Sequence, residues 1–208
     1  MIESIQTTVV AGKLKLIEGV VREALDGGAT ADEILDSMSV AMDEVGAKFQ
    51  RNEIYVPEML IAAKTMQRGV GVIKPLLAGD CVGKFGKFII GTVAGDLHDI
   101  GKNLVSMMTE AAGFEVIDLG VDVPADRFIE AIQENPDAKI VALSALLTTT
   151  MDAMKNTVEA ITAAGLRDKV KIMVGGAPIT KEFADSIGAD AYTTDAASCA
   201  EKAKELAS

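Results

Sequence analysis

His98 is the residue with the clearest chemical potential in this chain, because it is the only histidine among 208 residues. It lies in a glycine-rich segment, residues 91–103, and Asp96 precedes it by two positions. In extended backbone, side chains two residues apart project to the same side, so Asp96 can bind one ring nitrogen of His98 and leave the other free. A histidine held in this way by a carboxylate is typical of a metal ligand.

One histidine cannot by itself form a zinc or iron cage, since such sites need three or four protein ligands. It can supply one axial ligand to a macrocycle that brings its own equatorial nitrogens, and both haem and a corrinoid meet this description. A phosphocarrier histidine, a receiver-type phosphoaspartate and a histidine without chemistry are the alternatives. A receiver would end its third strand in Asp, whereas the third strand expected here ends in Ser144.

The elements that must position His98 are predicted by short runs rich in Val and Ile, which alternate with helical stretches from Lys87 onward. This alternation predicts right-handed crossovers and an α/β fold with a doubly wound, parallel, five-stranded sheet in the flavodoxin-like order 2-1-3-4-5. Ligands bind such Rossmann-like sheets at the carboxyl ends of the first and third strands, here loops 94–99 and 144–150. The expected strands are 87–93, 115–119, 139–144, 170–174 and 190–193.

Hydroxyl side chains crowd the second loop, at Ser144 and at the threonine run 148–150, beside the small Ala145. Such residues are often turn and helix-cap residues, and the alternative is a lining for the polar tail of a ligand. The fourth strand ends in Gly175 and Gly176, which remove two side chains from the same edge of the sheet.

Residues before this region have helical periodicity, which predicts an N-terminal helical bundle with segments 3–26, 31–49 and 56–78, the first interrupted near Gly12. The glycine-containing stretch 76–86 is the expected linker. We therefore predict a helical cap domain over residues 1–82 and an α/β domain over residues 83–208.

The chain is acidic throughout, with 20 Lys and Arg against 31 Asp and Glu and a net charge of −11. This charge argues against nucleic acid or an anionic membrane surface as a partner. Cys81 and Cys199 lie far apart and form no metal-binding cluster, and no signal peptide or membrane span is apparent, so a cytoplasmic protein is expected.

Three motifs in order resemble the signature of cobalamin-binding domains of the methionine synthase type. They are Asp96-Leu-His98-Asp-Ile-Gly101 (DxHxxG), Ser144-Ala-Leu146 (SxL) and Gly175-Gly176 (GG). The segment 49–57 and Met59 resemble the helical cap that precedes such domains. The whole chain is therefore similar to the small corrinoid proteins of methanogen and acetogen methyltransferase systems.

The resemblance implies a role for each matching residue. His98 would be the lower axial ligand of cobalt, Asp96 its hydrogen-bonded partner, and Thr150 the hydroxyl that completes the relay. The cofactor and its tail would lie against residues of the three motifs and the fifth strand: Gly95, Asp99, Ile100, Gly101, Ser144, Leu146, Thr148, Gly175, Gly176 and Thr193, with Thr194 an alternative to Thr193. The upper face of the corrin would be covered by Phe49, Val56 and Met59.

The resemblance also implies a carrier subunit that shuttles a methyl group on the corrinoid cobalt. One partner would be a substrate:corrinoid methyltransferase, another a methyltransferase that uses tetrahydrofolate or coenzyme M, and a third a reductive activator. Methylated amines, betaines, methanol and methoxyaromatics remain open as donors. A cobalamin-binding sensor or storage module is the alternative.

Overall fold

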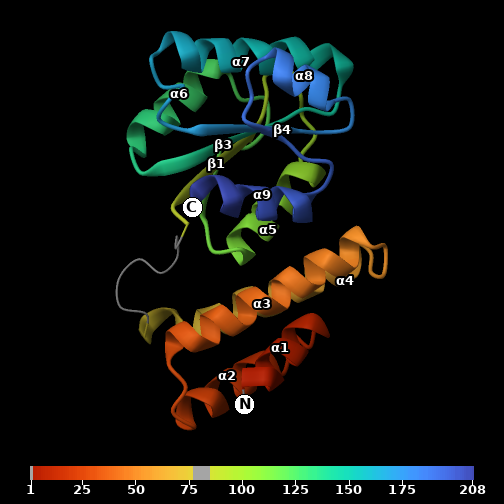
Figure 1. Cartoon of the computed structure of the whole chain (residues 1–208), viewed down its shortest axis with the longest axis vertical. Helices are drawn as coiled ribbons and strands as arrows, with labels where there is room; N and C mark the ends of the chain where they lie inside the picture. Colours follow the sequence, from red (N-terminus) through yellow and green to blue (C-terminus); the bar gives the residue numbers. More distant parts are fainter. Residues whose placement is uncertain (1, 77–84) are drawn as a thin grey trace. The chain divides into compact units, whose positions relative to one another are not determined.

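The structure is a computed structural model that describes residues 2–76 and 85–208. The chain divides into a helical unit and an α/β unit (Figure 1). The expected boundary between residues 82 and 83, and most of the expected linker, lie outside the described residues.

Four α-helices form the helical unit within residues 2–76: α1 (Ile2–Val10), α2 (Ile17–Asp26), α3 (Ala31–Gln50) and α4 (Val56–Ile73). The interruption expected near Gly12 is the turn between α1 and α2. Helix α4 ends earlier than the periodicity predicts, and a 3-10 turn, η1 (Lys74–Leu76), follows it. Pro75 lacks the N–H that another turn of α-helix would need at this position, which accounts for the end of α4.

The helical unit has its own apolar core, because each helix contributes side chains that are fully buried, among them Ile5, Ile17, Ile34 and Met66. Helix α3 starts at a capping box. The Glu33 amide donates to Thr30 Oγ1 at 3.2 Å, and Glu33 Oε2 accepts from the Thr30 amide at 2.8 Å. This exchange satisfies two amides that the first helical turn leaves without a backbone acceptor.

The α/β unit contains the five parallel strands that the sequence predicts, in the predicted order β2-β1-β3-β4-β5. The strands are β1 (Lys87–Thr92), β2 (Glu115–Asp118), β3 (Ala138–Ser144), β4 (Lys171–Gly175) and β5 (Ala191–Tyr192). The helices are α5 (Ile100–Ala111), α6 (Ala125–Glu134), α7 (Met151–Ala163), α8 (Lys181–Ser186) and α9 (Ala196–Ala207), with a 3-10 turn, η2 (Thr148–Thr150), before α7.

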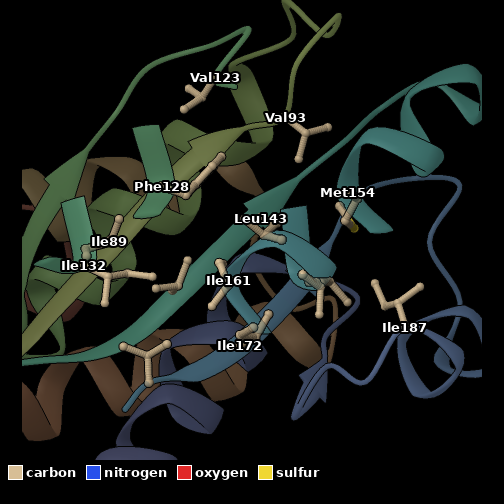
Figure 2. Close-up of a cluster of buried hydrophobic side chains, with 14 of the residues drawn as sticks. Ile89, Val93, Val123, Phe128, Ile132, Leu143, Met154, Ile161, Ile172 and Ile187 are labelled. Atoms are coloured by element: carbon tan, nitrogen blue, oxygen red, sulfur yellow. The ribbon is translucent and has the colours of Figure 1, made fainter. Parts of the chain in front are cut away.

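Helices cover both faces of this sheet, as Figure 1 shows: α6, α7 and α8 lie on one face, and α5 and α9 lie on the other. Figure 2 shows the apolar cluster of the first face, in which Ile89 and Leu143 of the central strands pack with Phe128 and Ile161 of the helices. The strands are buried on both faces, which explains their nearly continuous apolar sequence.

The strand register brings the loops that follow β1, β3 and β4 to one edge of the sheet. Thr92 pairs with Ser144, and Ser144 pairs with Gly175. The three sequence motifs therefore begin side by side. Within residues 2–76 and 85–208, the structure contains no helix long and apolar enough to cross a membrane.

Candidate functional site

The loop after β1 leaves the sheet through a tight turn. The Asp96 amide donates to the carbonyl oxygen of Val93 at 3.1 Å. Gly95 adopts a φ of +81°, a left-handed conformation that residues with a Cβ rarely occupy. This turn carries Asp96 back into the protein, while residues 97–100 extend outward.

Asp96 and His98 form the pair that their spacing predicts. His98 Nδ1 lies 2.7 Å from Asp96 Oδ1, and the His98 amide donates to the same oxygen at 3.1 Å. Asp96 is completely buried, whereas half of the His98 side-chain surface is exposed. Among the described residues, His98 Nε2 has no hydrogen-bond partner, so this nitrogen is available to a ligand.

The second oxygen of Asp96 joins the first loop to the second one. Asp96 Oδ2 accepts from the Leu146 amide at 2.7 Å and from the Leu147 amide at 3.2 Å. Thr150 Oγ1 lies 2.9 Å from the same oxygen and 2.9 Å from the Leu147 carbonyl oxygen. One carboxylate thus links the imidazole, two backbone amides and a hydroxyl from the ends of neighbouring strands.

The protonation of Asp96 follows from these contacts. Burial raises the pKa of its carboxyl, but hydrogen bonds from Leu146, His98 and Thr150 outweigh burial, so the pKa of Asp96 lies far below its ordinary value. The carboxylate is therefore ionised at neutral pH and can only accept hydrogen bonds. His98 Nδ1 must carry the proton between them, which leaves Nε2 of a neutral ring with the lone pair that a metal requires.

Four exposed apolar side chains lie on the two loops that Asp96 joins: Leu97 (72% exposed) and Ile100 (77%) on the loop of His98, and Leu146 (44%) and Leu147 (40%) on the other. Leucine and isoleucine are usually buried, and exposed apolar clusters commonly mark binding surfaces. In the described part of the chain, no group of three or more His, Cys, Asp or Glu side chains could hold a metal ion. One imidazole on loops that also expose apolar side chains fits a metal macrocycle such as a corrinoid rather than a bare ion.

The other residues that the sequence singles out lie around the same edge of the sheet. A Cβ placed on Gly101, at the start of α5, would meet no atom within 4 Å, and on Gly175 it would meet only the Thr193 carbonyl oxygen at 3.5 Å. Both positions thus have space beside them. Ser144 and Thr193 are half-buried, and Thr148 in η2 is exposed.

Gly176 differs from Gly175. Its φ is +129°, and a Cβ there would overlap the carbonyl oxygen of Ala145. The protein itself therefore requires glycine at this position, since the backbone after β3 occupies the place of a side chain.

Gly176→Ala should lower the free energy of unfolding of the cofactor-free protein by about 2–3 kcal/mol, because it adds both backbone strain and a steric overlap. Gly175→Ala is the matched control and should change stability by less than about 0.5 kcal/mol, since its Cβ makes an ordinary contact. Urea unfolding monitored by circular dichroism measures both values. Equal stability of the two variants would contradict this interpretation of Gly176.

The proposed covering residues belong to the helical unit, at the end of α3 and the start of α4. Phe49 and Val56 are half-buried. Met59 is only 1% exposed, as are other core residues of the bundle. A role for Met59 in covering a ligand would therefore require it to leave this core, while Phe49 and Val56 offer some free surface.

Two residues at the site have no counterpart in the sequence motifs. Thr92 Oγ1 donates to the carbonyl oxygen of His98 at 2.9 Å. Asp122, in the connection between β2 and α6, accepts from the Gly95 amide at 2.7 Å. Neither residue has a spacing that marks it, because each binds backbone atoms of the loop, and backbone atoms leave no pattern in a sequence.

Comparison with known proteins shows the family to which the chain belongs. Two family models, each described as a B12 binding domain, match residues 86–201 and residues 1–74. The dimethylamine corrinoid protein of Methanosarcina barkeri is 42% identical over 208 residues, which cover 99% of this chain and 97% of that protein.

Solved structures agree as well. A cobalamin-binding protein from Desulfitobacterium hafniense DCB-2 is 32% identical, with a TM-score of 0.85 and coverage of 99% of this chain and 98% of that one. A chain of the methanol:cobalamin methyltransferase complex of Methanosarcina barkeri is 26% identical, with a TM-score of 0.85 and coverage of 99% and 79%. The chain therefore belongs to the B12-binding corrinoid proteins of methyltransferase systems.

Proposed function

We propose that this protein is a methyl carrier that binds a corrinoid through His98 and serves two methyltransferases in turn. The observation that carries the proposal is the buried carboxylate of Asp96, which holds His98 Nδ1 at 2.7 Å and leaves Nε2 free on a loop that also exposes Leu97 and Ile100. When bound, the corrinoid supplies a cobalt centre that accepts a methyl group from one partner and releases it to another.

The residues of the chain would divide the work of holding this cofactor. His98 would provide the axial nitrogen, and the open positions beside Gly101 and Gly175 would accommodate the tail, with Ser144 and Thr148 as polar contacts. The ionised Asp96, which accepts from Nδ1 at 2.7 Å, would keep the ring oriented with Nε2 toward the cofactor.

We further propose that the methyl donor is a methylated amine. Support comes from the similarity to the dimethylamine corrinoid protein, which extends over 99% of this chain. The acceptor is proposed to be tetrahydrofolate or coenzyme M, which the second methyltransferase would select. A reductive activator and a cytoplasmic location belong to the same proposal, because a strongly reduced cofactor requires a reducing compartment.

A methyl-transfer assay tests the carrier function. The full-length protein is loaded with hydroxocobalamin, reduced, and incubated in separate samples with methyltransferases specific for monomethylamine, dimethylamine, trimethylamine or methanol, each with its radiolabelled substrate. We expect the label to appear on the loaded protein with at least one of the amine enzymes. A second methyltransferase should then transfer it to coenzyme M or tetrahydrofolate.

The methanol-specific methyltransferase is the internal control, since this sample differs from the amine samples in its enzyme and methyl donor but contains the same loaded protein. Label accepted only from methanol would contradict the assignment of a methylated amine as donor. A loaded protein that accepts no label from any of these enzymes, yet binds cobalamin tightly, would contradict the carrier function and favour a sensor or storage protein.

A further inference from the structure

The backbone of the loop that carries His98 is held by two side chains, Thr92 and Asp122, which we name the loop brace. Thr92 Oγ1 donates to the His98 carbonyl oxygen at 2.9 Å. Asp122 Oδ1 accepts from the Gly95 amide at 2.7 Å, and the Asp122 amide donates to the Asp96 carbonyl oxygen at 2.9 Å. The loop brace therefore fixes main-chain atoms at three positions of the loop: Gly95, Asp96 and His98.

Thr92 is a rigid anchor for this purpose. Its side chain is completely buried, so it cannot touch a ligand directly. Its backbone is fixed as well: the Thr92 amide donates to the Gly120 carbonyl oxygen at 3.0 Å, and the Thr92 carbonyl oxygen accepts from the Val123 amide at 2.9 Å. Any influence of the Thr92 hydroxyl on a cofactor must therefore pass through the backbone of His98.

The backbone conformation of Asp122 also supports a role in holding this loop. Its φ is +53°, a left-handed conformation that is uncommon for residues other than glycine and that Asp and Asn tolerate best. This conformation lets the amide and the carboxylate of one residue bind the loop together. Strain of this kind persists where the surrounding structure requires it, and it is concentrated at functional sites.

Both contacts matter because the His98 ring is otherwise weakly held. Half of its side-chain surface is exposed, and its ring is held by the hydrogen bond to Asp96. A metal–nitrogen bond depends steeply on distance and direction, so a loop free to shift would weaken it. Fixing the backbone on both sides of Leu97 prevents such a shift.

We propose that Thr92 and Asp122 are positioning residues that fix the backbone of His98 and thereby set the strength of its axial bond to the corrinoid. This inference rests on the proposed function, in which His98 Nε2 binds cobalt. It adds two residues outside the DxHxxG, SxL and GG motifs. These residues would act on the position of His98 and would not contact the corrinoid themselves.

The first test uses Thr92→Val, which removes the hydroxyl proton and keeps nearly the same volume. Thr92→Ser retains the hydroxyl and should rescue the loss. The matched control is Thr157→Val, because Thr157 is 2% exposed and its hydroxyl donates to the Ala153 carbonyl oxygen at 2.8 Å within α7. This control makes the same chemical change at a buried threonine whose hydroxyl serves only its own helix.

Two measurements are made on each variant. In the cofactor-free protein, hydrogen exchange of the loop amides should become about 10-fold faster in Thr92→Val, since one hydrogen bond that restrains the loop is lost. When the cofactor-free protein is titrated with cobinamide, a corrinoid without a lower base, the Kd should rise by about 10-fold in Thr92→Val. In the loaded protein, the nitrogen splitting in the cobalt(II) paramagnetic resonance spectrum should shrink. Thr92→Ser and Thr157→Val should stay within about 3-fold of the wild type.

A second pair of variants changes the other half of the loop brace. Asp122→Asn keeps an acceptor and tolerates the left-handed conformation, whereas Asp122→Ala loses the acceptor. Asp122 is exposed, so both variants should fold even if Thr92→Val does not. We expect Asp122→Ala to accelerate loop exchange and weaken cobinamide binding, and Asp122→Asn to remain close to the wild type.

The outcomes separate the loop brace from the proposed function. If the wild type itself shows no splitting from a histidine nitrogen, the proposed ligand role of His98 is wrong. If the wild type shows this splitting while Thr92→Val and Asp122→Ala match Thr157→Val in exchange, affinity and splitting, His98 is the ligand but the loop brace does not position it.

Discussion

Asp96→Asn is expected to lower the free energy of unfolding of the cofactor-free protein by about 3–4 kcal/mol and to weaken corrinoid binding by about 10- to 100-fold. The wild-type carboxylate is completely buried and accepts from His98 on one oxygen and from Leu146 and Thr150 on the other. An amide presents an N–H on one of these sides. A donor then faces donors, and buried hydrogen-bonding groups are left without acceptors.

Asp99→Asn is the matched control for this change. It removes the same charge from the same loop, but Asp99 is exposed, and Asn103 Nδ2 donates to its carboxylate at 3.1 Å. We expect it to alter stability by less than about 0.5 kcal/mol. Urea unfolding of the cofactor-free proteins measures both variants, and titration with hydroxocobalamin measures the affinity of Asp96→Asn against that of the wild type. If Asp96→Asn unfolds at the same urea concentration as Asp99→Asn, the hydrogen bonds of Asp96 do not hold the loops after β1 and β3 together.

His98→Ala is expected to leave the fold intact and to remove axial coordination. The side chain is half exposed and lies in a loop, so little packing is lost. The affinity for cobinamide should fall by about 100-fold, the upper end of the effects seen when the environment of a metal ligand is altered. Added imidazole should partly restore the axial nitrogen, because the substitution opens a space beside Asp96.

Restoration by added imidazole serves as the control for His98→Ala, since free imidazole replaces the missing ring without being attached to the protein backbone. Cobinamide is the appropriate probe, because cobalamin carries a base of its own that could replace the histidine. An unchanged affinity for cobinamide in His98→Ala, with no response to imidazole, would show that another group holds the cobalt.

Much of the α/β unit could be predicted from its sequence, because strand residues buried on both faces form nearly continuous apolar runs. Even β5, which is only Ala191–Tyr192, falls within the strand that a weak apolar pattern predicts at 190–193. In the helical unit the periodicity predicts where α4 starts but not where it ends. Apolar residues continue past Ile73, and only the effect of Pro75 on the backbone stops the helix.

The candidate site shows a sharper division between what sequence can and cannot predict. The contact between Asp96 and His98 follows from a spacing of two residues, and the approach of Thr150 follows from a family resemblance. The Leu146 and Leu147 amides that also bind Asp96 could not be predicted, because every residue except proline has an amide.

Gly176 illustrates a different limit. A glycine pair beside a predicted ligand site suggests room for the ligand, and Gly175 has such room. At Gly176 the space is taken by the Ala145 carbonyl oxygen, so its glycine serves the contact between two loops. A glycine in the sequence shows only that no side chain is present at that position. The structure is needed to show which atoms fill the space.

We propose that His98 binds the corrinoid cobalt, and the chain permits a direct test because it contains one histidine. Protein without a histidine tag is produced with 15N-labelled histidine, loaded with cobalamin and reduced to the cobalt(II) state for paramagnetic resonance. Axial 14N splits each resonance into a triplet, whereas axial 15N splits it into a doublet. We predict a doublet in the labelled protein and a triplet in the unlabelled protein. A triplet in both would show that the axial nitrogen belongs to the cofactor's own base and would contradict the role of His98 as the cobalt ligand.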